Sequence, residues 1–282
     1  MQRVVSTYLY VNQKLTTGLL GELAAAGMHG VEVFCDRGHF DYRSPEQVRT
    51  LAEWFRDHRL KLHSMHAPTS RDFSVRRESR TPISISDGER VRRLDAVDEI
   101  KRALEVAEHI PFPFLTQHLG ASREESDPRR LEAACNSLEH LAMFAKQRGV
   151  TIALENTPGS LGAPATLRQF IADTRLTDLR LCFDTGHAHM EEGVTPSFET
   201  MRDLVVTTHV HDNKGEKDDH LLPFEGSIDW PATLKAFAKA PAAPGGLPIV
   251  LELKDTGARA LPLNEMVEVF DRFEGAAAAR TK

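Results

Sequence analysis

The chain has 282 residues, which is long enough for one (β/α)8 barrel. Of these residues 41% are hydrophobic and 27% are charged, a composition that is ordinary for a globular protein with a full core. A formal net charge of −6 disfavours general attraction to nucleic acid, and no apolar run approaches the roughly 18 residues that a membrane span requires. The N-terminus lacks a signal-peptide layout, and three scattered cysteines without CxxC spacing indicate neither disulfides nor a thiolate metal site, so we expect a cytoplasmic protein.

Short β-branched or apolar runs alternate with longer segments of helical spacing along the whole chain. The expected strands are 3–9, 30–34, 61–67, 112–119, 150–156, 179–185, 204–211 and 248–254. The expected helices are 16–27, 44–58, 88–110, 127–149, 165–174, 197–204, 229–240 and 263–273. Start signals support two of them, because Ser44 precedes Pro45 and Asp229 precedes Trp230 and Pro231.

These eight strand-then-helix units predict an α/β fold, a single (β/α)8 TIM barrel over residues 1–275 with a flexible tail at 276–282. A doubly wound open sheet is the alternative architecture. That fold normally carries a glycine-rich phosphate loop after its first strand, and "STYLYVNQ" has none.

Polar side chains close nearly every expected strand. In a (β/α)8 barrel, the chemistry lies at the C-terminal ends of the strands. Burying such groups unpaired would cost several kcal/mol each, so barrel stability alone does not account for them. In chain order they are Glu32, His63, His66, His118, Glu155, Asn156, Asp184, His209, His211, Asp212 and Glu252.

The last four strands supply Glu155, Asp184, His211 and Glu252 in turn. Any one of these residues can be a structural hydrogen-bond or salt-bridge partner, but their convergence at one rim favours a cation site. Carboxylates together with an imidazole suit a divalent metal ion such as Mn²⁺, Co²⁺, Mg²⁺ or Zn²⁺.

The chain resembles the sugar phosphate isomerase/epimerase superfamily, the xylose isomerase-like barrels that also include type IV AP endonucleases. The resemblance covers most of the chain in the expected order and is specific for the superfamily, but it does not choose a member. It rests on "GVEVF", "HAP", "QHLG", "ALENTPG", "CFDTGHAH", "HVHDNKGEKDDHLLPFEGSIDW" and "IVLELK".

The resemblance implies a metal held by Glu155, Asp184, His211 and Glu252, with Glu155 and Glu252 moving the substrate proton and His187 contacting the substrate. Strand alternation places His209 on the same side as His211, so one can bind the metal while the other orients it or the substrate. His211 is preferred as the ligand, and His209 is the alternative. The other residues expected to contact substrate are His66, His118, His209, Asp218 and His220.

The implied reaction is isomerisation or epimerisation of a small keto-sugar, cyclitol or sugar phosphate through a metal-stabilised enediolate. A sugar or cyclitol dehydratase (a lyase) begins with the same steps and is an alternative. The expected partner is therefore a small sugar or polyol, and the sequence leaves open whether the chain forms a homo-oligomer.

A zinc-dependent phosphodiester hydrolase is the rival interpretation. Type IV AP endonucleases hold three zinc ions, and this chain offers candidates for all of the ligands: His66, His118, Glu155, Asp184, His187, His211 or His209, Asp218, His220 and Glu252. An arginine-rich stretch over residues 70–93 suits phosphate on DNA or on a sugar, although Arg90, Arg92 and Arg93 also suit a solvated helix face.

Two further observations bear on these interpretations. A non-enzymatic sugar-binding barrel is a third class of function, but binding alone does not require both Glu155 and Glu252. In "DDHLLPFEG", Phe224 replaces the first glycine of the form common in relatives, which puts the geometry of that loop in doubt.

Overall fold

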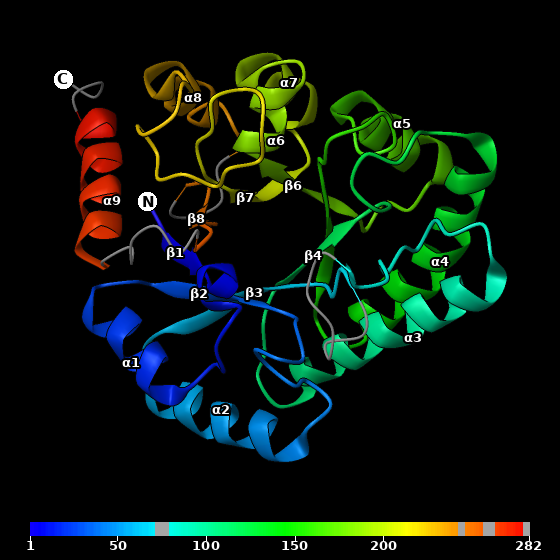
Figure 1. The fold of residues 1–282 in the computed structure, drawn as a ribbon, viewed down its shortest axis with the longest axis horizontal. Coiled ribbons are helices and arrows are strands. Elements are labelled where there is room, and N and C mark those ends of the chain that lie inside the picture. The colour runs from blue at the N-terminus through cyan, green and yellow to red at the C-terminus, as the bar shows by residue number, and fades with distance from the viewer. Residues whose placement is uncertain (71–78, 242–245, 256–262, 279–282) are drawn as a thin grey trace.

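Eight parallel strands form one sheet in the order β7-β6-β5-β4-β3-β2-β1-β8 in the computed structural model (Figure 1). The structure describes residues 1–70, 79–241, 246–255 and 263–278. The strands are β1 (Arg3–Ser6), β2 (Gly30–Phe34), β3 (Lys61–His66), β4 (Phe114–His118), β5 (Thr151–Glu155), β6 (Arg180–Asp184), β7 (Val205–His209) and β8 (Ile249–Leu251).

The sheet closes into a barrel between β7 and β8, through the residue that follows β7. Val210 N donates to Val250 O at 2.8 Å, and Glu252 N donates to Val210 O at 3.2 Å. The predicted (β/α)8 barrel is confirmed. Because all of the strands run parallel, their C-terminal ends share one mouth.

The helices lie outside the strands, as Figure 1 shows. Two predicted start signals act as side-chain caps: Ser44 Oγ accepts from Gln47 N, and Asp229 Oδ1 accepts from Ala232 N. The helices are α1 (Thr17–Ala25), α2 (Pro45–Asp57), α3 (Arg90–Glu105), α4 (Pro128–Lys146), α5 (Pro164–Thr174), α6 (Thr185–Met190), α7 (Val194–Met201), α8 (Trp230–Phe237) and α9 (Leu263–Ala278).

Several details differ from the expected elements, and one of them is that β7 ends at His209, so His211 lies beyond it. Helix α6 was not predicted, and it begins directly after β6 because Asp184 caps it by accepting from His187 N at 2.7 Å. Strand β8 ends at Leu251, so Glu252 follows the strand. Helix α9 continues to Ala278, which makes part of the expected tail helical, and residues 279–282 lie outside the described ranges.

Ion pairs and apolar packing join the barrel to its outer layer. Arg3 of β1 pairs with Asp271 and Glu274 of α9 at 2.7 and 2.6 Å. Phe183 of β6 packs edge-on against Phe198 of α7 at 5.0 Å between ring centroids. Of the helices described, none is both long and apolar enough to cross a membrane.

Candidate active site

A cavity of about 260 Å³ opens at the C-terminal mouth of the barrel. Tyr8 and Phe34 form part of its wall and lie 4.9 Å apart between ring centroids, and Phe34 also packs 4.6 Å from His66. The predicted site residues that line the cavity are His66, His118, Glu155, His187, Asp218, His220 and Glu252. The remaining three, Asp184, His209 and His211, are fully buried beside it.

Glu155, Asp184, His209 and Glu252 converge on one point beside this cavity. One ligand atom from each lies within 4.8 Å of the others. His209 Nδ1 is 3.1 Å from Glu155 Oε1, 3.6 Å from Glu252 Oε2 and 4.0 Å from Asp184 Oδ2. All four residues are at most 4% exposed, so the group concentrates negative charge away from water.

A divalent cation fits this group because of the chemistry of its donors. His209 Nε2 donates to Glu32 Oε2 at 3.1 Å, so a neutral ring turns the lone pair of Nδ1 toward the carboxylates. Nδ1 makes no hydrogen bond with any described residue, although Glu155 is close. A cation satisfies the imidazole and the carboxylates together, whereas the carboxylates by themselves repel one another.

The charges in the group strongly shift the pKa values of its members. Burial by itself lowers the pKa of an imidazole, but Glu252, Glu32 and Glu155 raise the pKa of His209 well above its ordinary value. Burial raises the pKa of a carboxyl, but His209 and His118 hold the pKa of Glu155 well below its ordinary value. Glu155 is therefore ionised, and without a metal His209 carries a proton.

Glu155 also faces imidazoles from β3 and β4. Its Oε2 lies 3.4 Å from His66 Nε2 and 3.1 Å from His118 Nε2. His66 Nδ1 donates to the carbonyl of Ala67 at 2.8 Å, so Nε2 of a neutral ring is free to accept or to bind a metal. Glu155 thus stands between the His209 group and this pair of histidines.

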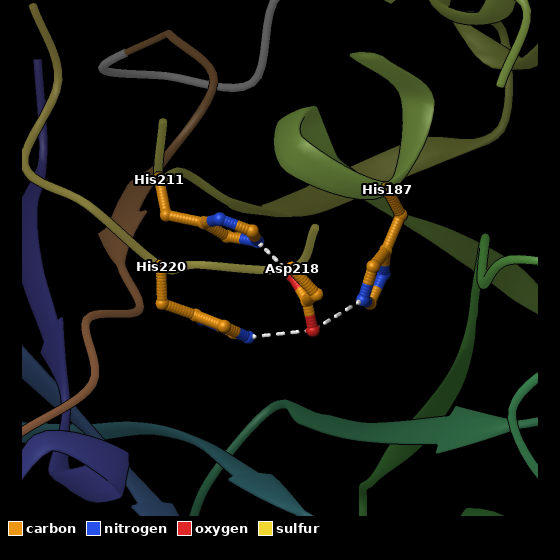
Figure 2. Close-up of side chains that lie close together, drawn as sticks. All are labelled: His187, His211, Asp218 and His220. Atoms are coloured by element: carbon orange, nitrogen blue, oxygen red, sulfur yellow. Dashed lines mark hydrogen bonds and ion pairs between the residues drawn. The ribbon is translucent and has the colours of Figure 1, made fainter. Parts of the chain in front are cut away.

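A second group comprises His187, His211, Asp218 and His220, and Figure 2 shows their side chains turned toward one another. The carboxylate of Asp218 lies 3.5 Å from His187 Nε2, 3.1 Å from His220 Nε2 and 3.8 Å from His211 Nε2. Partial burial raises the pKa of Asp218, but hydrogen bonds from His187 and His220 outweigh it and lower that pKa. Asp218 is 39% exposed, so this group lies nearer to solvent than the first.

Backbone carbonyls fix the orientation of two rings in the second group. His187 Nδ1 donates to Asn156 O at 2.9 Å, and His220 Nδ1 donates to Glu252 O at 2.8 Å. Each neutral ring then directs Nε2 at Asp218. This arrangement is typical of histidines that bind a metal through one nitrogen and are oriented through the other.

Asp212 folds the loop that carries Asp218 and His220. Its Oδ1 accepts from the backbone N–H groups of Asn213 and Ile228 at 2.9 and 3.1 Å. Its Oδ2 accepts from Phe224 N at 2.9 Å and from Trp230 Nε1 at 2.7 Å. One buried carboxylate therefore closes the loop on itself and places its two site residues at the mouth.

The same loop shows how Phe224 replaces a glycine. Its φ is 80°, in the left-handed region that favours glycine. Its ring packs against Trp230 and Phe273, and the guanidinium of Arg272 lies 3.4 Å from the ring centroid. These contacts hold a strained residue in place, so the loop keeps its shape without the glycine.

Of the described arginines in the 70–93 stretch, two form ion pairs, and Arg93 donates to the carbonyl of Asp87. Arg80 pairs with Asp36, and Arg92 pairs with Asp87 and Glu89. The pairs of Arg92 fit a solvated helix face. Other arginines of the stretch, at Arg71, Arg76 and Arg77, lie outside the described residues.

All ten predicted site residues lie in or beside these groups. One histidine differs from the expected arrangement. The sequence preferred His211 beside Glu155, Asp184 and Glu252, whereas the structure brings His209 into that group. Sequence reasoning assigned no role to Glu32 or Asp212, although it noted both as polar residues near strand ends. Tyr8 gave no signal, because it lies in a short 3₁₀ turn after β1.

Comparisons with known proteins agree with this architecture. The family model for the xylose isomerase-like TIM barrel matches residues 20–273. The uncharacterized protein MJ1311 of Methanocaldococcus jannaschii is 28% identical over 236 residues, which cover 80% of this chain and 75% of that protein.

Two solved structures share the fold. A D-tagatose 3-epimerase-like protein superposes with a TM-score of 0.78 and 23% identity, covering 99% of this chain and 98% of that chain. The zinc-bound IOLI protein superposes with a TM-score of 0.76 and 16% identity, covering 97% and 96%. With the family match over residues 20–273, the chain belongs to the xylose isomerase-like TIM barrel family.

Proposed function

We propose that this protein is a divalent-metal-dependent isomerase or epimerase of a small keto-sugar, cyclitol or sugar phosphate. The observation that carries the proposal is the convergence of Glu155 and Glu252, with Asp184, on Nδ1 of His209 beside the mouth cavity. Similarity to a D-tagatose 3-epimerase-like protein supports the same class of reaction. The cavity, at about 260 Å³, suits one small polyol.

Glu155, Asp184, His209 and Glu252 would hold the metal ion. When bound, a divalent cation supplies Lewis acidity that polarises a carbonyl and an adjacent hydroxyl. The donor set of carboxylates and one imidazole suits Mn²⁺, Co²⁺, Mg²⁺ or Zn²⁺.

The carboxylates of Glu155 and Glu252 would carry the proton. They come from β5 and from the residue after β8, and both line the cavity, so both can reach a substrate bound there. Glu155 is ionised and can accept the proton beside a carbonyl, and Glu252 can return one to the other face. His187, His118 and His220 line the same space and can hydrogen-bond substrate oxygens.

The test is exchange of solvent deuterium into a panel of ketoses, cyclitols and their phosphates, followed by NMR. The wild-type protein should label the reacting carbon of at least one of them. Glu155→Gln and Glu252→Gln should abolish labelling, while the matched control Glu192→Gln, an exposed residue, should retain it. Undiminished labelling in either active-site variant would remove the proton-transfer role of that residue.

Phosphodiester hydrolysis at abasic DNA is a second candidate, favoured by the second group of ligands. His187, His211, Asp218 and His220, together with Glu155 and its histidines, supply donors for more than one ion, and clustered metals suit phosphoryl transfer. Elemental analysis distinguishes the two. One tightly bound metal per chain, with or without a weaker ion in the second group, favours proton transfer, whereas three metals with nicking of abasic plasmid would replace the sugar reaction by hydrolysis.

A dehydratase shares the first proton abstraction with an isomerase. It differs in expelling a hydroxyl group from the neighbouring carbon, so its product is unsaturated. The same NMR experiment separates the two, because a lyase gives a new vinylic signal and an isomerase does not.

A further inference from the structure

Glu32 is a carboxylate at the centre of the barrel, below the predicted ligands. It comes from β2 and has no exposed surface. Its Oε2 accepts from Ser64 Oγ of β3 at 2.8 Å, from Thr116 Oγ1 of β4 at 3.3 Å and from His209 Nε2 of β7 at 3.1 Å. Four strands thus meet at one buried negative charge.

Barrel stability does not require a charge at this position. The interior of a (β/α)8 barrel is ordinarily filled by layers of branched apolar side chains, and a buried ionised carboxylate is costly unless it is paired. The ring nitrogen Nε2 of His209 pairs with this carboxylate, because it lies 3.1 Å from one oxygen of Glu32 and 3.0 Å from the other.

The position of His209 explains why a carboxylate lies here. Its ring has Glu32 at Nε2 and the carboxylates of Glu155 and Glu252 around Nδ1. An imidazole can present a lone pair at Nδ1 only if its proton is at Nε2, and an acceptor at Nε2 stabilises that tautomer. A charged acceptor also makes the opposite nitrogen a stronger donor to a metal.

We propose that Glu32 is a positioning residue that holds His209 with its proton at Nε2 and its Nδ1 lone pair directed at Glu155, Asp184 and Glu252. Glu32 itself does not line the cavity, so it acts through His209. The inference rests on the metal site of the proposed function.

The experiment measures metal affinity rather than turnover. Zn²⁺ is titrated against a chromophoric chelator into the wild-type protein, Glu32→Gln and Thr116→Val at one slightly alkaline pH. Glu32→Gln keeps the shape but removes the charge, so the affinity should fall by about 10- to 100-fold, as for other outer-shell partners of metal ligands. Thr116→Val removes another hydrogen bond to the same carboxylate but leaves its contact with His209, and its affinity should stay near the wild-type value.

A second readout reports the tautomer directly. In the zinc-loaded wild-type protein labelled with ¹⁵N-histidine, His209 should show a proton on Nε2 that exchanges slowly with water. That proton should exchange faster in Glu32→Gln. If Glu32→Gln does not fold by circular dichroism, Glu32→Asp serves instead, because it keeps the charge but withdraws it from the ring, and an intermediate affinity is expected.

The outcomes separate the two levels of the proposal. Equal zinc affinity and an unchanged Nε2 proton in a folded Glu32→Gln would overturn the positioning role and leave the metal site intact. A wild-type protein that takes up no metal would overturn both. A loss of stability in Glu32→Gln without a change in affinity would mark Glu32 as structural only, and would likewise overturn the inference.

Discussion

Asp184 Oδ2 lies 3.1 Å from His211 Nε2, and neither side chain is exposed. The same carboxylate belongs to the group formed with Glu155, His209 and Glu252. His211 therefore contacts the first group through Asp184, and its ring stacks 3.9 Å from that of His220 in the second group. This contact joins the two sets of candidate ligands.

Replacing His209 by asparagine and replacing His211 by asparagine should have different effects on metal binding. In His209→Asn, the tightest zinc equivalent should weaken by more than about 100-fold, because loss of an outer-shell partner alone costs 10- to 100-fold. In His211→Asn, that equivalent should stay near wild type, and a weaker one should be lost. Chelator competition measures both, with His189→Asn as a control at the mouth. The reverse order would restore His211 as the ligand of the first group.

Gly186→Ala should displace His211 without any change in its chemistry. A Cβ at position 186 would lie 1.9 Å from His211 Cε1, so the ring must move. We expect loss of the weaker zinc equivalent and a destabilisation of about 1–3 kcal/mol from overpacking. Gly275→Ala is the matched control, because its Cβ meets open space, and alanine in helix α9 should be neutral or slightly stabilising. Wild-type zinc stoichiometry in Gly186→Ala would argue against a role for His211 in binding.

Asp212→Asn should loosen the loop that carries Asp218 and His220. The amide replaces one acceptor oxygen, so two of the four donors on Asp212 lose their partner. Unsatisfied buried donors cost about 1–3 kcal/mol each, and we expect the free energy of unfolding to fall by about 2–4 kcal/mol. Urea unfolding of the metal-free protein checks this, with Glu216→Gln as an exposed control in the same loop. An unchanged midpoint would show that the loop does not depend on Asp212.

The metal-free protein should lose stability as the pH rises above about 6.5, which is the ordinary pKa of a histidine side chain. The pKa of His187 and that of His209 are raised well above this value: burial lowers both, but Asp184 and Asp218 outweigh it at His187, and Glu252, Glu32 and Glu155 do so at His209. Above about 6.5 the folded state therefore binds more protons than the unfolded chain, and the free energy of unfolding falls by about 1.4 kcal/mol per pH unit for each ring.

Urea unfolding in the presence of a chelator at several pH values measures this slope. His209→Asn should reduce it, and saturating zinc should reverse it, because a metal displaces the protons. A flat profile for the metal-free protein above neutral pH would contradict the charge arrangement described for these rings.

The fold was predictable because its signals are local. β-branched runs, helical spacing and cap residues such as Ser44 and Asp229 act within a few positions, so the alternation of strands and helices could be read directly. The polar strand ends were equally visible, and the parallel topology brings Glu155, Asp184 and Glu252 to one mouth. Helix α6 was missed because its six residues are too few for a periodic pattern.

The sequence by itself determined the barrel, the mouth at which the polar residues meet, and the kinds of donor they offer. Only the tertiary structure brings His209, rather than His211, into the group with Glu155, Asp184 and Glu252. His209 is the last residue of β7, whereas His211 lies two residues beyond the end of that strand. The register that pairs Asp184 with His209 sets which ring stands level with the carboxylates. Glu32 and His209 are 177 positions apart in the sequence, and they come into contact only when the barrel closes.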